Sequence, residues 1–269
     1  TNVGAMIALQ NLQVTNNELT QVQSRINTGK KVATAKDNGA VWAIAQGQRA
    51  EIGALNAVKD SLQRGQSAVD VSLAAGESVS DLLVTLKEKA LAATDTSLTT
   101  SARSALNEDF KSIRDQIATV VSNASFNGVN LLDGSSTAGF EALANVTGST
   151  ITVSSEDMSL SGSVVTLGAS DVIDTASAAT ASLALVSASI DNVGASLAKL
   201  GTGSNSLGTH LTFVGKLQDT LEAGVGNLVD ADLAKESARL QALQTKQQLG
   251  VQALSIANSS TSILLGLFR

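Results

Sequence analysis

Aliphatic side chains recur in alternating steps of three and four residues through the second half of the chain. Such a heptad pattern is typical of a long helix whose apolar line packs against other helices. Twelve of the fourteen positions are aliphatic, so the pattern predicts one coiled-coil helix over residues 176–229. The register continues through residues 201–208, which we expect to be helical although each glycine costs about 1 kcal/mol relative to alanine. The series is Leu183, Val186, Ile190, Val193, Leu197, Leu200, Ser204, Leu207, Leu211, Val214, Gln218, Leu221, Val225 and Leu228.

Two further apolar series predict helices over residues 42–93 and 101–124. The first series contains the small residues Gly65, Ser72 and Gly76, where a partner helix can approach closely. The second follows a Ser/Thr cluster at residues 99–101, which can cap its N-terminus. Three long apolar lines can bury one another, so we expect a three-helix rod. Its predicted core consists of Leu55, Leu62, Val69, Leu83, Phe110, Ile117, Leu183, Ile190, Leu197, Leu211 and Leu221.

Between the predicted helices 101–124 and 176–229, the spacing of apolar residues changes from about 3.5 residues to two. Asn127-Gly128 is the sequence signal of a type I′ turn, and Asp133-Gly134 is a further turn signal. Alternating apolar residues follow at Ile151/Val153, Met158/Leu160 and Val165/Leu167. This pattern predicts a small β-hairpin region over residues 126–168.

The two ends of the chain are apolar and almost uncharged. Residues 1–29 contain only Glu18 and Arg25 as charged residues, and no charged residue lies between Lys246 and Arg269. A helix that faces water normally carries charge on its wet side, so we expect both end helices to be covered on most sides. Their apolar positions are Leu12, Leu19, Val22 and Ile26 at the N-terminal end, and Leu240, Leu243, Leu254, Ile263, Leu264 and Phe268 at the C-terminal end.

Composition excludes several classes of function. The chain has no Cys and one His, which rules out thiol chemistry and leaves little for a metal site or a catalytic triad. Its net charge of −6 argues against binding to nucleic acid. No apolar run approaches the roughly 20 residues of a membrane span, and the N-terminus lacks the pattern of a cleaved secretory signal. Between Arg114 and Lys199 the chain has eight acidic residues and no basic ones, which we interpret as a solvated surface.

Four segments of the chain resemble bacterial flagellin, the subunit of the flagellar filament. They are residues 16–40 (NNELTQVQSRINTGKKVATAKDNGA), residues 125–134 (SFNGVNLLDG), residues 227–258 (NLVDADLAKESARLQALQTKQQLGVQALSIAN) and the ending LLGLFR. The resemblance covers nearly the whole chain and is closest to the short, alphaproteobacterial type without large outer domains. Because the family's usual start lies several residues upstream, we expect that Thr1 is not the encoded N-terminus.

The resemblance implies a mainly α fold in two layers. Residues 1–29 and 230–269 would form an inner tube of coiled-coil helices, a spoke would span residues 30–41, and residues 42–229 would form the rod with its β-hairpin region. The apolar positions of both ends would then pack against other subunits. Because an isolated chain lacks those partners, the ends are expected to be disordered until assembly. Heterologous contacts that do not close would generate a helical filament.

Two groups near the spoke have alternative interpretations. Trp42 is predicted to be a core anchor, and the alternative is a hot spot between subunits. Lys30, Lys31 and Lys36 are predicted to lie in a solvated turn, and the alternative is pairing with acids such as Asp37 across subunits.

Three other sites invite a ligand interpretation that the residues do not favour. His210 has no second metal ligand within four residues, so it is predicted to be an ordinary helix residue. Asp230 and Asp232 are predicted to cap the last helix, with a cation site as the alternative. Gly203 and Gly208 have the spacing of a phosphate loop, but the required Lys-Ser/Thr pair and the preceding strand are missing. No cofactor is therefore predicted.

Family membership also implies partners and a location. The partners would be other flagellin subunits, the filament cap, the hook-filament junction proteins, the flagellar type III export apparatus and a cytosolic export chaperone that binds residues 249–268. The protein would be exported unfolded and located in the extracellular filament. O-glycosylation of residues 146–180 and bare hydroxyl groups remain equal alternatives. Recognition by an innate immune receptor is not expected, because Lys87-Glu88-Lys89 stands where the family has arginines.

Three classes of function come into consideration for this chain. A self-assembling filament subunit, without enzymatic activity, fits these features best. A junction or minor axial protein of the same flagellum is the nearest alternative. An enzyme or a lytic coiled-coil toxin would need clustered catalytic groups or a basic amphipathic helix, and the chain has neither.

Overall fold

The computed structural model describes the backbone of residues 2–266 and the side chains of residues 2–259. The chain forms two compact units. The terminal unit comprises Thr1–Ile52 with Asp219–Arg269, and the central unit comprises Gly53–Gln218. The described residues contain five helices, α1 (Val3–Thr28), α2 (Gly39–Ala93), α3 (Thr100–Asn123), α4 (Ala176–Val229) and α5 (Leu233–Gly266). The predicted mainly α fold with a small β region is confirmed.

Local chemistry sets the helix ends. The Asn2 side chain accepts a hydrogen bond from the Ala5 N–H at 3.1 Å and caps α1. The helix ends at Gly29, which has a φ of 68°. This is the left-handed conformation, which glycine adopts easily because it has no Cβ. Asp232 Oδ1 caps α5 by accepting from the Lys235 N–H at 3.1 Å. The glycine-rich residues 201–208 lie inside α4, as the unbroken apolar register predicted.

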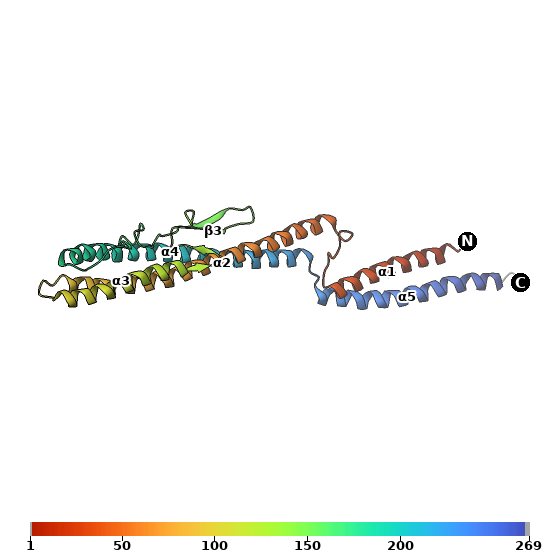
Figure 1. The fold of residues 1–269 in the computed structure, drawn as a ribbon. Helices are drawn as coiled ribbons and strands as arrows, with labels where there is room; N and C mark the ends of the chain where they lie inside the picture. The colour runs from red at the N-terminus through yellow and green to blue at the C-terminus, as the bar shows by residue number, and fades with distance from the viewer. Residues whose placement is uncertain (1, 267–269) are drawn as a thin grey trace. The chain divides into compact units, whose positions relative to one another are not determined.

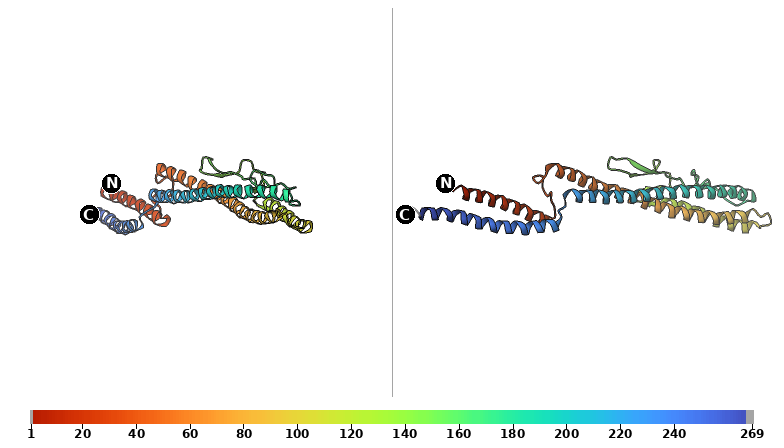
Figure 2. Two further views of the ribbon diagram at one scale, coloured as in Figure 1. Left: turned by 90° about the vertical axis from the view of Figure 1, so that its left-hand side faces the viewer. Right: turned by 180° about the vertical axis from the view of Figure 1, so that it is seen from behind.

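In the central unit α2, α3 and α4 lie side by side, as the views in Figures 1 and 2 show. Small residues on α2 allow the close approach. A Cβ at Gly76 would lie 2.7 Å from Leu197 Cδ2 on α4, and a Cβ at Gly65 would lie 2.8 Å from Phe140 Cε1. The side chains of α2 and α3 named as rod core are buried, namely Leu55, Leu62, Val69, Leu83, Phe110 and Ile117.

The buried line of α4 differs in part from the predicted one. Val186 and Val193 are fully buried, but Leu183, Ile190, Leu197, Leu211 and Leu221 are only half-buried. The other buried line consists of polar residues, Ser182, Ser189 and Ser196, spaced seven residues apart. The helix is therefore rotated so that serines face the interior, because a non-helical segment covers them and needs hydrogen-bond partners.

The β structure is smaller than predicted. Strands β1 (Ser125–Phe126) and β2 (Val129–Asn130) form one hairpin, and β3 (Phe140–Leu143) and β4 (Thr150–Val153) form a second one. The prediction of strands at Met158/Leu160 and Val165/Leu167 is wrong, because residues 154–175 contain no strand. We call residues 154–175 the strap. Several strap residues that belong to the alternating pattern are buried, including Met158, Val165 and Leu167. The spacing of two therefore correctly indicated which residues are buried, although the strap does not pair with another strand.

Helix side chains hold the strap in place of a ladder. Ser182 Oγ donates to the Val172 carbonyl at 2.9 Å. Ser189 Oγ accepts from the Thr166 N–H at 3.0 Å. Ser196 Oγ donates to Glu156 Oε2 at 2.7 Å, and Lys199 Nζ lies 3.1 Å from Glu156 Oε1. Each buried serine of α4 thus fixes one point of the strap.

By length and composition, α4 is the one described helix that could cross a membrane. Packing within the fold explains part of the apolar character of α4, because five of its apolar side chains are buried there: Val186, Val193, Leu200, Leu207 and Val214.

Candidate self-association surface

Helices α1 and α5 form an antiparallel pair in the terminal unit (Figure 1). Three contacts between them fix the direction. Asn2 Nδ2 donates to the Ala257 carbonyl at 2.7 Å, Gln247 Nε2 donates to Asn16 Oδ1 at 2.8 Å, and Arg25 Nη1 lies 3.1 Å from Glu236 Oε1. The position on α5 falls as the position on α1 rises, so the start of α1 lies beside Ala257 on α5.

The apolar residues predicted for contact between subunits lie mainly in the seam between α1 and α5 of the same chain. Val22 is 1% exposed and Leu243 is 5% exposed. Leu12, Leu19, Ile26, Leu240 and Leu254 are half-buried. Small residues narrow the seam, since a Cβ at Gly250 would lie 3.2 Å from Leu12 Cδ1. The Ile263, Leu264 and Phe268 side chains lie outside the described residues. Contact of this set with other subunits stays a prediction.

Pairing leaves a second set of apolar side chains in water. Of the fourteen large hydrophobic side chains that are exposed in the described residues, nine belong to α1 and α5. They are Val3, Met6, Ile7, Leu9 and Val14 on α1, and Leu233, Leu249, Val251 and Ile256 on α5. The heptad pattern marks the seam and not these outer faces, so none of the nine was among the positions predicted to pack between subunits. The scarcity of charge at the two ends was the signal that could have found them.

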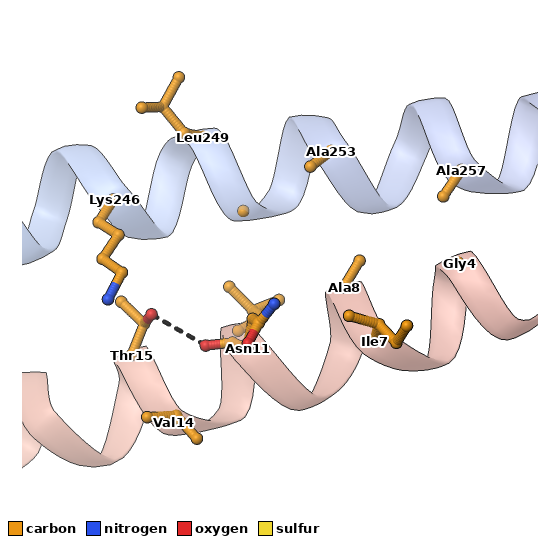
Figure 3. A pocket seen from close by; sticks show the side chains of 12 residues that line it. Gly4, Ile7, Ala8, Asn11, Val14, Thr15, Lys246, Leu249, Ala253 and Ala257 are labelled. Carbon is orange, nitrogen blue, oxygen red and sulfur yellow. Dashed lines mark hydrogen bonds between the residues drawn. The ribbon is translucent and has the colours of Figure 1, made fainter.

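Exposed apolar residues also line a groove of about 620 Å³ between the two helices. The lining includes Ile7 and Val14 from α1 and Leu249 and Ala253 from α5, which are labelled in Figure 3. Polar groups are few: Thr15 Oγ1 donates to the Asn11 carbonyl at 2.9 Å, and the Lys246 side chain extends over the groove. Such a lining suits an apolar helix face and offers no reacting group.

Charged residues gather at the spoke end of the pair. Glu236 is 9% exposed and forms the ion pair with Arg25 described above, yet Glu236 Oε2 and Arg25 Nε are buried without a hydrogen-bond partner in the described structure. Neither Glu236 nor this pair was predicted from the sequence. Because an unpaired buried charge is costly, the ion pair fixes the position of α1 along α5.

The spoke itself is fixed by hydrogen bonds within the terminal unit. The Lys31 and Val32 N–H groups both donate to the Val229 carbonyl, at 2.7 and 3.3 Å. Lys31 Nζ donates to the Asn227 carbonyl at 2.9 Å. The Ala231 N–H donates to the Gly29 carbonyl at 2.9 Å. These contacts tie the residues after α1 to the end of α4 and to Ala231, which lies between α4 and α5.

Asp37 closes the spoke turn. Its Oδ2 accepts from the Thr34 N–H at 2.8 Å, from the Ala33 N–H at 3.0 Å and from Thr34 Oγ1 at 3.2 Å. The backbone hydrogen bond from Thr34 is the main reason why the pKa of Asp37 lies below its usual 3.8. Asp37 is therefore engaged within its own turn.

Trp42 lies in the first turns of α2. It is partly buried and packs against a cluster of Val32, Ala45, Val225 and Val229 in the terminal unit. Its side chain thus joins the start of α2 to the end of α4 in this unit. Its role as a core anchor or as a contact between subunits stays a prediction.

The other candidate sites have structural roles. Asn127 and Gly128 form the turn between β1 and β2, with φ values of 50° and 80°. His210 Nε2 lies 2.6 Å from the Ala144 carbonyl at the end of β3, so this side chain joins the second hairpin to α4. Among the described residues no group of three or more His, Asp or Glu could hold a metal ion.

Comparison with known proteins identifies the family. Residues 1–137 match the family model for the bacterial flagellin N-terminal helical region, and residues 183–268 match that for the C-terminal helical region. The chain is 61% identical to flagellin FljM of Caulobacter vibrioides and 37% identical to a flagellin of Brucella melitensis, over all of this chain and at least 97% of each relative.

Two solved structures share the fold at lower identity. A Bacillus cereus flagellin crystal structure matches with a TM-score of 0.51 and 21% identity, over 57% of this chain and 88% of the other. A putative flagellar hook-associated protein from Vibrio parahaemolyticus matches with a TM-score of 0.59 and 16% identity, over 72% of this chain and all of the other. With the family models and the full-length relatives, these findings place the chain in the bacterial flagellin family, as a structural subunit of the flagellar filament.

Proposed function

We propose that the chain polymerises through the outer faces of the α1–α5 pair, so that the terminal units of successive subunits form the inner tube of the filament. The observation that carries this proposal is the apolar exterior of the pair away from the spoke, where residues 3–17 and 247–259 contain no charged side chain. There Met6 is 60% exposed, Leu249 60% exposed and Ile256 68% exposed. Full burial of one such side chain contributes about 1.5–3 kcal/mol. An array of copies can supply that burial, whereas a single chain cannot.

The α1–α5 pair is thin, which supports ordering during assembly. Among the described side chains of the two helices, only Thr15, Val22, Glu236 and Leu243 are buried. Two helices that bury so little offset only part of the entropy lost on ordering. In this proposal the pair is poorly ordered in the free chain and gains stability when neighbours cover its outer faces.

Delivery follows from the same chemistry. We propose export through the flagellar type III apparatus in an unfolded state and addition at the distal tip below the filament cap, on a base of hook-filament junction proteins. A cytosolic chaperone would cover the apolar residues 249–268 beforehand. The absence of Cys and Pro supports this route, because neither disulfides nor slow prolyl isomerisation can delay the chain.

Seeded elongation tests the proposal. Purified monomer is added to sheared filament fragments, and filament length is followed by electron microscopy together with a variant that lacks residues 1–28. The full chain should elongate without limit, whereas the truncated chain should stay soluble and keep the helical signal of its central unit. Elongation by the truncated chain would refute the assignment of α1. Wild-type growth that stops after a short segment would instead favour a junction protein.

A further inference from the structure

The turn between β1 and β2 presents a reactive pair of residues. Asn127 and Gly128 are both exposed, and a Cβ at Gly128 would meet nothing within 4 Å. Within the described structure, neither the Asn127 side-chain amide nor the Gly128 N–H has a hydrogen-bond partner. The turn is closed by the pairing of Phe126 with Val129, followed by that of Ser125 with Asn130. Among the described residues, no hydrogen bond restrains the Asn127 amide, and the space beside Gly128 is open.

We propose that Asn127 is a site of spontaneous deamidation in the folded protein. The Gly128 nitrogen, after losing its proton to hydroxide, attacks Asn127 Cγ and forms a new C–N bond. The bond from Cγ to Nδ2 breaks, and Nδ2 takes up a proton from water and leaves as ammonia, so a succinimide remains. Water then opens the ring at either carbonyl and gives aspartate or isoaspartate. No oxidant, cofactor or enzyme is required.

Isoaspartate would disturb more than the turn. It routes the backbone through the former side chain and adds a carbon to a two-residue connection whose positive φ angles fix the hairpin. The hairpin leads directly into the interior: Asn130 Nδ2 donates to the Val121 carbonyl at 2.7 Å, and Asn130 Oδ1 accepts from the Leu132 N–H at 2.8 Å. Leu131 and Leu132 are fully buried. Deamidation would therefore loosen the central unit slowly while adding a negative charge.

The chain contains a matched internal control with the same dipeptide. Asn38-Gly39 begins α2, and Asn38 Oδ1 accepts from the Val41 N–H at 3.1 Å as the helix cap. The Asn38 carbonyl also accepts from the Trp42 N–H at 2.9 Å. The succinimide at Asn38 can form only after this cap opens. A typical cap is worth about 1 kcal/mol, which corresponds to about fivefold protection of Asn38 relative to Asn127.

The experiment is incubation of the full-length monomer in warm, mildly alkaline buffer, followed by peptide mapping with mass spectrometry. Isoaspartate is quantified with an isoaspartyl methyltransferase, and the same protein in concentrated urea is the unfolded reference. The variant Asn127→Asp supplies the standard for the aspartate product.

In urea the two Asn-Gly sites should react at similar rates, because their dipeptides are identical. In the folded protein Asn127 should react at least about fivefold faster than Asn38. Equal rates at the two sites in the folded protein, or faster reaction at Asn38, would overturn the proposal. Because the monomer is used, this result is independent of polymerisation.

Discussion

Replacement of Leu249 by alanine tests the outer face of the α1–α5 pair. Leu249 is 60% exposed and lines the groove in Figure 3. Leu→Ala removes three carbons, worth about 2.4 kcal/mol on full burial at about 0.8 kcal/mol each. Since roughly 60% of that burial is left for a neighbouring subunit to supply, the loss on assembly is about 1.4 kcal/mol. This predicts an increase of about tenfold in the critical concentration for elongation.

The assay is seeded elongation over a series of monomer concentrations, with the residual monomer measured after growth stops. Leu249→Met is the matched control, because it keeps the apolar volume and should change the critical concentration much less. Thermal unfolding of the central unit should be the same in both variants. If Leu249→Ala elongates at the wild-type critical concentration, the groove is not covered in the filament and the reasoning from exposure fails.

Three further perturbations test the fold. Gly76→Val should lower the free energy of unfolding by about 1–3 kcal/mol in denaturant melts, because a Cβ at this position lies 2.7 Å from Leu197 Cδ2. Unchanged stability would mean that α2 and α4 are farther apart than in this structure. Ser189→Ala should cost about 1 kcal/mol in the same melts by leaving the part-buried Thr166 N–H without its partner, whereas Ser189→Thr should restore part of it. Asp37→Asn should speed backbone exchange in the spoke at neutral pH. Since the folded-state pKa of Asp37 is depressed, the wild-type advantage should be full above about pH 3.8 and disappear as the pH falls through the folded pKa; an advantage that persists in stronger acid would contradict this cause.

The periodic spacing of apolar residues predicted the helices well, because it marks the face of each helix that is buried. The helix predicted over residues 176–229 has those bounds in the structure, including its glycine-rich part. The rotation of α4 could not be predicted in the same way. Val186 and Val193 belong to the predicted series, but Ser189 carries no apolar signal. A buried serine is recognisable only when its hydrogen-bond partner in the strap is known.

The strap shows a related limit of period-two patterns. Alternation at Met158, Val165 and Leu167 indicated an extended segment with one buried side, and these residues are buried. Whether an extended segment pairs with another strand depends on what lies beside it. Here helix α4 provides the hydrogen-bonding groups, so the segment stays irregular.

At the candidate site, the sequence indicated that the two ends need to be covered, but it did not separate the two surfaces involved. Val22 and Leu243 face the seam within the chain, whereas Ile7 and Leu249 face outward. From the sequence alone, an aliphatic residue that faces the seam cannot be told from one that faces outward. Only the antiparallel register, set by pairs such as Arg25 with Glu236, assigns each residue to one surface.

Hydrogen exchange of the backbone amides, followed by mass spectrometry on free monomer and on filaments, tests most directly the claim that the chain ends acquire their environment from other copies. Peptides from residues 2–28 and 233–259 should exchange rapidly in the monomer and be strongly protected in the filament, while peptides from α3 should be protected in both. Strong protection of both ends in the dilute monomer, unchanged on polymerisation, would contradict the account.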